Sequence, residues 1–465
     1  MVVVSFTEDS LLDILERLPT KSLLRFKCVD RSWNLLFQSP IFLNRHMQRQ
    51  RQRFHDRVMT FDFLTFFGRT ETRTETQKPS VKLFSFNGPS QFEVQEQGYP
   101  QFPSPDSFNS VLLDVLDIHH SNGSFYLDRL FGNYNSNEYL QDSFPSPNNL
   151  LPADIDDMSH CNGVFCLERS FRPKYPYPPR RRLRDPYHPH DSVYDAIVSQ
   201  IILWNPATRE LRCVPPSPNQ PLLGTYILKR SRFFVGFGAD PITCDLKVVK
   251  LYLVLDKDEK ALVPSAEVYD LSTNSWTVIN GFDPDDIIGL DHYDSSINLC
   301  KHDHKDNNAY ANGIYYWLSP DCTYILCFDF RYNRFRRVST PTIPPTSGSY
   351  IFEIDDSIAY TVHSNSAEEY YNRVDIWILK HDCWSKMYNI DHFHAVAFVS
   401  AIWNDGAEFL GTWFNMIYPE EEDPFIEFFL VSHNSDGQIV HQFYLSHDFF
   451  FKVCKYVESI VQLSI

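Results

Sequence analysis

The residues with the clearest capacity for chemistry are a group of histidines and aspartates in the second half of the chain. The group comprises His292, His302, Asp303, His304 and Asp306. Imidazole and carboxylate side chains are zinc ligands, but their spacing here matches no standard zinc site. The residues around them are typical of a loop. The group therefore does not predict a metal centre.

Patterns for nucleotide binding and covalent catalysis are also weak. Gly236-Phe237-Gly238 lacks the later glycine and the helix of a nucleotide-binding loop, so it predicts a bulge or close packing. No Gly-x-Ser-x-Gly occurs, and no serine or cysteine is visibly paired with a base. None of the 10 cysteines forms a Cys-x-x-Cys pair, which favours reduced, buried thiols. We expect no catalytic residue, no cofactor and no metal.

Charge is divided unevenly along the chain. The formal net charge is −17, yet residues 1–60 hold ten Lys or Arg against six Asp or Glu, which leaves −21 on the other 405. Such a field repels nucleic acid and anionic membranes and attracts a basic partner. The alternative explanation is that the negative charge only keeps the large domain soluble. The basic run Lys174 to Arg184 fits a proline-rich surface insertion better than a nuclear localisation signal.

Length and composition predict a small domain followed by a large one rich in strands. The chain has 465 residues, of which 71 are aromatic, with only 16 glycines and 30 prolines. Aromatic residues favour strands, and prolines favour the loops between them. No apolar run has the length of a membrane helix and no signal peptide is visible, so we expect a cytosolic or nuclear protein.

Short amphipathic helices are predicted for the first fifty residues. Apolar positions from Leu11 to Leu18 lie on one helical face, and Pro19 ends that helix. Thr20 is expected to cap the second helix and Pro40 to begin the fourth. Helices this short cannot bury all their leucines, so their apolar surface predicts either a partner or docking on the large domain.

The run from Leu11 to His46, LLDILERLPTKSLLRFKCVDRSWNLLFQSPIFLNRH, strongly resembles the F-box of plant F-box proteins. The resemblance implies binding to the Skp-type adaptor of a cullin–RING ubiquitin ligase. Phe6-Thr7 stands where the family usually has Leu-Pro. The adaptor-binding residues that the resemblance implies are Leu11, Leu15, Leu18, Pro19, Leu23 and Leu24.

The basic stretch from Arg45 to Arg57 follows this motif. A solvated helix continuing from the preceding one explains it better than a nucleic-acid-binding arm, because everything after it is acidic. We expect an F-box over residues 1–50, a linker over 51–60 and a second domain over 61–465.

A strand, a polar turn and a second strand recur along the second domain. Five residues occupy equivalent positions in successive repeats, at intervals of 65, 59, 51 and 52 residues. They are Trp204, Tyr269, Phe328, Leu379 and Val431, and we call them the anchors. These intervals suit four-stranded propeller blades, and the whole predicts a ring of six or seven. Further strand-like segments are 58–67, 81–86 and 111–131, and hairpin signals are Asn122-Gly123, Asn162-Gly163, Asn312-Gly313 and Asp405-Gly406.

The turns resemble those of the F-box-associated domain, as in LWNPATRE from Leu203 and YVESIVQL from Tyr456. The closest resemblance is to S-locus F-box proteins of the rose family. It implies a mainly β fold, with a helical F-box followed by a degenerate kelch-like β-propeller. Because the repeats run up to Val461, ring closure predicts that the final strand completes a blade with N-terminal material. The resemblance also implies a pollen role in self-incompatibility, with basic S-ribonucleases as targets.

The sequence therefore predicts a non-catalytic substrate receptor. Its partners are a Skp-type adaptor, a cullin and a basic protein substrate, with no nucleic acid and no membrane. The alternatives are a receptor for another target, or a propeller enzyme or sugar-binding module with a central pocket.

Overall fold

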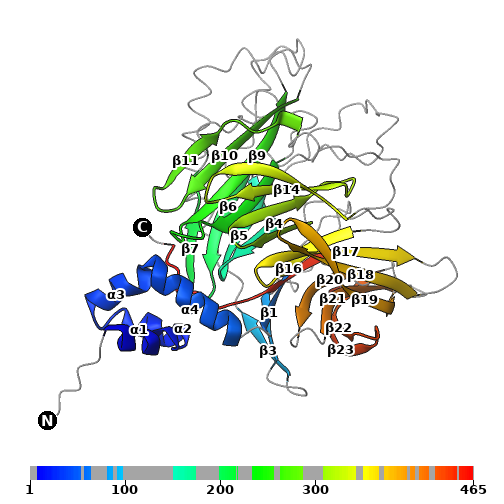
Figure 1. The fold of residues 1–465 in the computed structure, drawn as a ribbon, viewed down its shortest axis with the longest axis horizontal. Helices are drawn as coiled ribbons and strands as arrows, with labels where there is room; N and C mark the ends of the chain where they lie inside the picture. The colour runs from blue at the N-terminus through cyan, green and yellow to red at the C-terminus, as the bar shows by residue number, and fades with distance from the viewer. Residues whose placement is uncertain are drawn as a thin grey trace.

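In the described part of the chain, four helices come first and strands follow them (Figure 1). The computed structural model describes residues 8–53, 57–63, 81–86, 92–97, 150–173, 198–215, 217, 233–255, 262–285, 307–341, 349–365, 371–394, 398–403, 408–417, 425–447 and 450–463. The helices are α1 (Glu8–Glu16), α2 (Thr20–Phe26), α3 (Arg31–Gln38) and α4 (Pro40–Arg53). We call residues 8–53 the helical region.

The ends of these helices follow local chemistry. The Asp30 carboxylate accepts a 2.6 Å hydrogen bond from the Ser32 amide and caps α3. Pro40 begins α4, as predicted. The prediction for Thr20 was wrong: Pro19 occupies the N-cap position of α2, and the Thr20 hydroxyl instead points to the carbonyl oxygen of Glu458, 3.5 Å away.

Six four-stranded antiparallel sheets, the blades, follow the helical region. The first blade has the order β24 (Phe450–Lys455), β1 (Arg57–Phe63), β2 (Val81–Phe86) and β3 (Phe92–Gln97). The next two comprise β4 (Leu150–Cys161), β5 (Val164–Pro173), β6 (Val198–Asn205), β7 (Glu210–Cys213), then β8 (Phe233–Ala239), β9 (Leu246–Leu255), β10 (Leu262–Asp270) and β11 (Ser275–Ile279).

The remaining three blades follow in chain order. They comprise β12 (Asn308–Ala311), β13 (Ile314–Leu318), β14 (Tyr324–Asp329), β15 (Arg334–Ser339), then β16 (Ser349–Ile354), β17 (Ser357–Asn365), β18 (Tyr371–Lys380), β19 (Cys383–His394), and finally β20 (Phe398–Trp403), β21 (Glu408–Ile417), β22 (Phe425–Asn434) and β23 (Ile439–His447).

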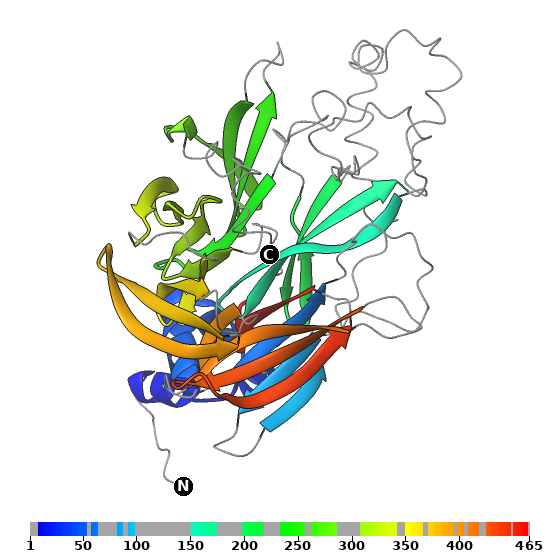
Figure 2. The same cartoon turned by 90° about the vertical axis from the view of Figure 1, so that its right-hand side faces the viewer.

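First strands of neighbouring blades contact one another at four junctions, from β4 to β8, from β12 to β16, from β16 to β20 and from β20 to β24. At the other two junctions β8 contacts β13 and β1 contacts β4. Figure 2 shows the blades from a second side, with β1 to β3 in blue beside the last blade in orange and red. The ring is closed by β24, which pairs antiparallel with β1, for example Val453 with Thr60. The expected completion of a blade by N-terminal material is confirmed.

The repeat found in the sequence is the third strand of each blade. All five anchors fall there, on β6, β10, β14, β18 and β22 in turn, and each polar turn leads to the fourth strand. Asn162-Gly163 and Asn312-Gly313 join first to second strands, with positive φ at all four residues, as a type I′ hairpin requires. The segment 111–131 and Asn122-Gly123 lie outside the described residues, as do 404–407.

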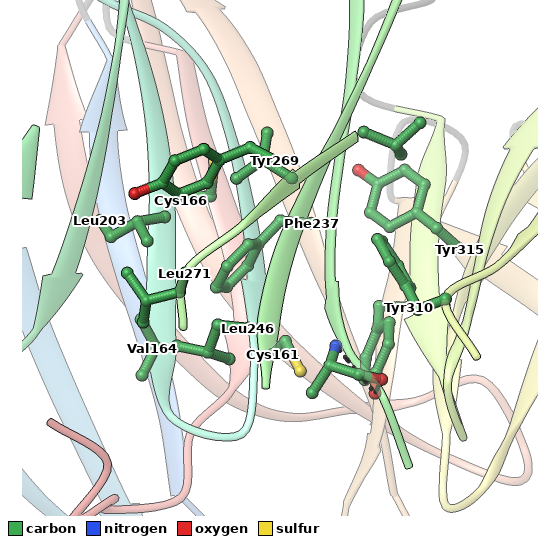
Figure 3. Packing of buried hydrophobic residues seen from close by; sticks show 14 of the residues in the cluster. Cys161, Val164, Cys166, Leu203, Phe237, Leu246, Tyr269, Leu271, Tyr310 and Tyr315 are labelled. Atoms are coloured by element: carbon green, nitrogen blue, oxygen red, sulfur yellow. Dashed lines mark hydrogen bonds between the residues drawn. The ribbon is translucent and has the colours of Figure 1, made fainter. Parts of the chain in front are cut away.

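The largest core cluster lies between blades. Figure 3 shows Leu203 and Phe237 from neighbouring blades packed together, with Tyr310 bonded to the backbone of Ala239. Gly236 and Gly238 permit this packing, because a Cβ would lie 2.6 Å from Trp317 and 2.2 Å from Phe330, respectively. The prediction of close packing at this glycine pair is confirmed.

Candidate partner-binding surfaces

The helical region is held together by a row of aromatic rings and by ion pairs. Successive ring centroids lie 5.3 Å apart for Phe26 and Trp33, 5.0 Å for Phe37 and Phe42. A stacked contact of 6.0 Å then links Phe42 to His46. These rings join α2, α3 and α4 into one unit.

Two arginines of α4 bind the acidic side of α1. The Arg49 guanidinium lies 2.6 Å from Asp13 and 3.1 Å from the buried Glu16, and Arg45 lies 3.3 Å from Glu16. At the end of this helix pair, His46 Nε2 and Gln50 Nε2 both lie 3.2 Å from the Leu18 carbonyl oxygen. Burial lowers the pKa of His46, so its ring is neutral near pH 7.

The basic stretch is helical from Arg45 to Arg53, as predicted, but Arg57 lies in β1, and the helix is exposed to solvent on one side only. His46 and Gln50 are buried and Arg49 is half-buried, because α4 packs against α1. Counter-ions on α1 pair with Arg45 and Arg49.

The end of α4 also seats the helical region on the ring of strands. Arg51 donates to Asp356 at 3.1 Å and to Asn162 at 3.2 Å, and these residues lie in the β16–β17 and β4–β5 turns. Asn44 donates to the carbonyl oxygen of Pro241, in the β8–β9 turn, at 3.4 Å. The turns between first and second strands of three blades thus face the helical region.

Because neighbouring strands of a blade are antiparallel, the pairing also tells from which face of the propeller each of the other connections starts. Turns between third and fourth strands lie on the same face as those between first and second strands, and the strand bounds leave two to six residues for each of these turns. Connections from second to third strands, and from one blade to the next, leave from the opposite face. Five of these are long, at residues 64–80, 98–149, 174–197, 214–232 and 280–307.

Two family models match the chain. A model described as "F-box associated beta propeller domain" matches residues 193–463, and one described as "F-box domain" matches residues 5–45. The chain belongs to the F-box-associated β-propeller family. The helical region is its F-box, and the six blades form its propeller.

Relatives from Arabidopsis thaliana carry F-box names. The chain is 30% identical over 114 residues to "F-box protein At1g15015", covering 24% of this chain and 68% of that protein. It is 26% identical over 141 residues to "Putative F-box protein At3g10430", covering 30% and 32%. Over 42 residues it is 50% identical to "Protein SUPPRESSOR OF NIM1 1", covering 9% and 11%. The chain thus spans about a third or less of the length of two of these relatives.

A solved propeller from the Trilobed protease of Pyrococcus furiosus is 12% identical, with a TM-score of 0.28 over 61% of this chain and 81% of that one. No argument follows from a likeness at this level.

The six leucine and proline positions expected to bind the adaptor are not equally accessible. Leu15 and Leu23 are buried in the core of the F-box, while Leu11, Leu18 and Leu24 are half-buried against it and Pro19 is exposed. Adjacent helix positions point about 100° apart, so Leu15 turns inward and Ile14 outward.

Four exposed apolar side chains of the F-box were not among the expected contacts. They are Ile14, Val29, Leu35 and Ile41, between 44% and 70% exposed. The expectation followed leucines of the family motif, which include core positions. For Ile14, Leu35 and Ile41, a position between core residues on an amphipathic helix is the signal that could have found them, whereas Val29 lies in the turn between α2 and α3.

The connections that start from the strand ends opposite the F-box account for most of the chain's net negative charge. By sequence, the twelve connections that join those strand ends together hold 29 Asp or Glu and 16 Lys or Arg, a net −13 of the chain's −17. Asp283 and Asp285, in the long connection between β11 and β12, are exposed.

Several predicted features lie outside the described residues. They are the His292 to Asp306 group and the Lys174 to Arg184 run. In the described part of the chain, no three His, Cys, Asp or Glu side chains gather as metal ligands would, and no helix has the length and apolarity to span a bilayer. Nine cysteines are described as free thiols; four are buried, while Cys28 and Cys383 are exposed.

Proposed function

We propose that this protein is the substrate receptor of a cullin–RING ubiquitin ligase, with its F-box bound to a Skp-type adaptor and its propeller bound to a protein substrate. The observation that carries the proposal is the two-faced arrangement: the F-box is seated on the face of tight turns, and the long acidic connections leave from the other. A receptor needs two binding surfaces that do not compete for space.

The adaptor surface consists, in this proposal, of the accessible members of the expected set together with Ile14. Leu11, Leu18, Pro19 and Leu24 retain exposed or half-buried apolar surface on α1, α2 and the turn between them. Leu15 and Leu23 act indirectly, by holding these helices in place.

The substrate surface is the propeller face opposite the F-box, and its acidic connections suit a basic protein. The S-locus resemblance makes a basic S-ribonuclease of the pistil the specific candidate. Solubility in the cytosol or nucleus fits a ligase subunit.

The protein's contribution to ubiquitin transfer is proximity, not bond chemistry. Holding a substrate near the ubiquitin-charged enzyme raises the effective concentration of its lysines. We therefore propose no catalytic group and no cofactor in this chain.

The adaptor contact is tested by Ile14→Asp, with Val278→Asp as the matched control. Ile14 is 44% exposed on the F-box and Val278 is 42% exposed on β11, so neither substitution disturbs a core. An unpaired carboxylate in an apolar interface costs about 2 kcal/mol or more, so we expect adaptor affinity to fall roughly 30-fold or more for Ile14→Asp only. Equal adaptor binding by both variants, with unchanged melting, would refute this surface.

The specific substrate is tested by affinity purification from pollen. Recovery of both an adaptor and a basic ribonuclease supports the S-locus role. Recovery of an adaptor with another protein supports a receptor for a different target.

A further inference from the structure

The last described residues of the chain lie between the F-box and the propeller. We call Phe450–Leu463 the coupling segment: β24 comes first, and the extended residues Tyr456–Leu463 follow. In Figure 1 it is the red segment that runs along α4 and ends near β7. Ile460 and Leu463 are 1% exposed and belong to a cluster that includes residues of both domains.

The propeller holds this segment by its backbone. Asn205 Nδ2, at the end of β6, donates to the carbonyl oxygens of Ser459 at 3.1 Å and Val461 at 2.8 Å. Arg212 Nη1 on β7 donates to the Leu463 carbonyl oxygen at 2.9 Å, and the Leu463 amide donates to a Glu210 carboxylate oxygen at 2.7 Å.

The F-box holds the opposite side of the same segment. Lys27 Nζ, just after α2, donates to the Ile460 carbonyl oxygen at 3.1 Å. Gln38 at the end of α3 donates to the side chain of Gln462, and the Thr20 hydroxyl reaches Glu458. Lys27 is half-buried at this contact, and burial lowers the pKa of its ammonium group.

The segment that holds the F-box is continuous with the strand that closes the ring. Closure pairs β24 with β1, and β1 begins only four residues after the end of α4. Both strands that close the ring are therefore adjacent in the chain to elements that hold the F-box on the propeller: β1 follows α4, and β24 precedes Tyr456–Leu463. Opening this pair releases, at the same time, the start of the coupling segment and the strand that follows α4.

We infer that the coupling segment makes ring closure and F-box placement a single cooperative event, so that α2 and α3 are held in place only while the propeller is closed. A receptor with an open or incomplete ring does not present a fixed adaptor surface. The test below measures both hydrogen exchange and adaptor affinity. The measurement of adaptor affinity rests on the proposed function, and the measurement of exchange does not.

The test is amide hydrogen exchange on the full chain, read at α2 and α3. Ile460→Ala shortens a buried side chain of the coupling segment. Ile376→Ala makes the same change at a buried residue of β18, in a separate core cluster. Lys27→Met removes one charge-assisted hydrogen bond and keeps the chain length, and Val453→Pro removes a donor from the closing strand without touching the F-box.

We expect Ile460→Ala, Lys27→Met and Val453→Pro to raise exchange at α2 and α3 about tenfold or more, whereas Ile376→Ala raises exchange only in its own blade. Adaptor affinity should fall in the same three variants. Unchanged protection of α2 and α3, or an equal rise in Ile376→Ala, overturns the inference. If Val453→Pro does not fold, the matched isoleucine pair and Lys27→Met decide. If the wild type binds no adaptor, the proposed function fails while the exchange result still stands.

Discussion

Gly163 offers the sharpest test of how closely the coupling segment is seated on the propeller. It lies in the β4–β5 turn with φ +74°, and an added Cβ would lie 2.0 Å from the Val457 carbonyl oxygen and 2.9 Å from Ser459 Cβ. The carbonyl belongs to the backbone, which cannot rotate away as a flexible side chain can. Gly163→Ala therefore combines an unfavourable backbone conformation with a steric overlap.

Two other glycines separate these effects. Gly281 has φ +80° with nothing within 4 Å of the added Cβ, and Gly313 has φ +80° with the Pro241 ring 2.9 Å away. The left-handed conformation alone costs about 1 kcal/mol for alanine, and overpacking adds roughly 1–3 kcal/mol. We expect Gly281→Ala to lose about 1 kcal/mol, Gly163→Ala about 2–4 kcal/mol, and Gly313→Ala an intermediate amount.

The assay is urea unfolding followed by tryptophan fluorescence, with midpoints compared at a common slope. Exchange at residues 456–463 should also rise in Gly163→Ala and stay at the wild-type level in Gly281→Ala. If Gly163→Ala and Gly281→Ala have the same midpoint, the segment is not seated on this turn and the reasoning fails.

Three further predictions concern charged groups. Burial raises the pKa of Glu353 to about 7, so the native state keeps a proton that the unfolded chain releases near pH 4.5. The free energy of unfolding should therefore fall as the pH rises from about 4.5 to 7. Melting curves of Glu353→Gln should show a weaker pH dependence. Lys247 Nζ lies 2.9 Å from Asp270, and both are mostly buried, so Lys247→Met should lose about 1.5–3 kcal/mol in urea unfolding, with Lys247→Met/Asp270→Asn recovering part of it. Association with a basic protein, measured by surface plasmon resonance, should slow about tenfold or more from low to high salt and slow further in Asp283→Asn/Asp285→Asn; a salt-independent rate would leave the acidic face a solubility feature.

Local patterns in the sequence predicted much of the fold. A hairpin is specified by residues close together in the sequence: a strand, a polar turn and a second strand, with an aromatic residue nearby. This local pattern is why Trp204 and Tyr269 marked equivalent third strands. Pro40 likewise began a helix because its fixed φ suits that position.

Contacts between distant parts of the chain could not be read in the same way. Thr20 looked like a helix cap, but its hydroxyl faces Glu458, 438 residues later. The resemblance placed Leu15 and Leu23 among the adaptor contacts, whereas packing between the short helices buries both side chains. Periodicity shows that a residue faces something apolar, and only the fold shows whether that is the chain's own core or a partner.

Ubiquitin transfer in a reconstituted ligase tests the central claim most directly. The wild-type chain, combined with adaptor, cullin, RING protein and ubiquitin-charged enzyme, should modify a basic protein captured by the propeller. Ile14→Asp should still capture that protein but should no longer support ubiquitin transfer. Val278→Asp should both capture the protein and support transfer, as the wild type does. Transfer that continues in Ile14→Asp, or capture by the F-box in place of the propeller, would contradict the account.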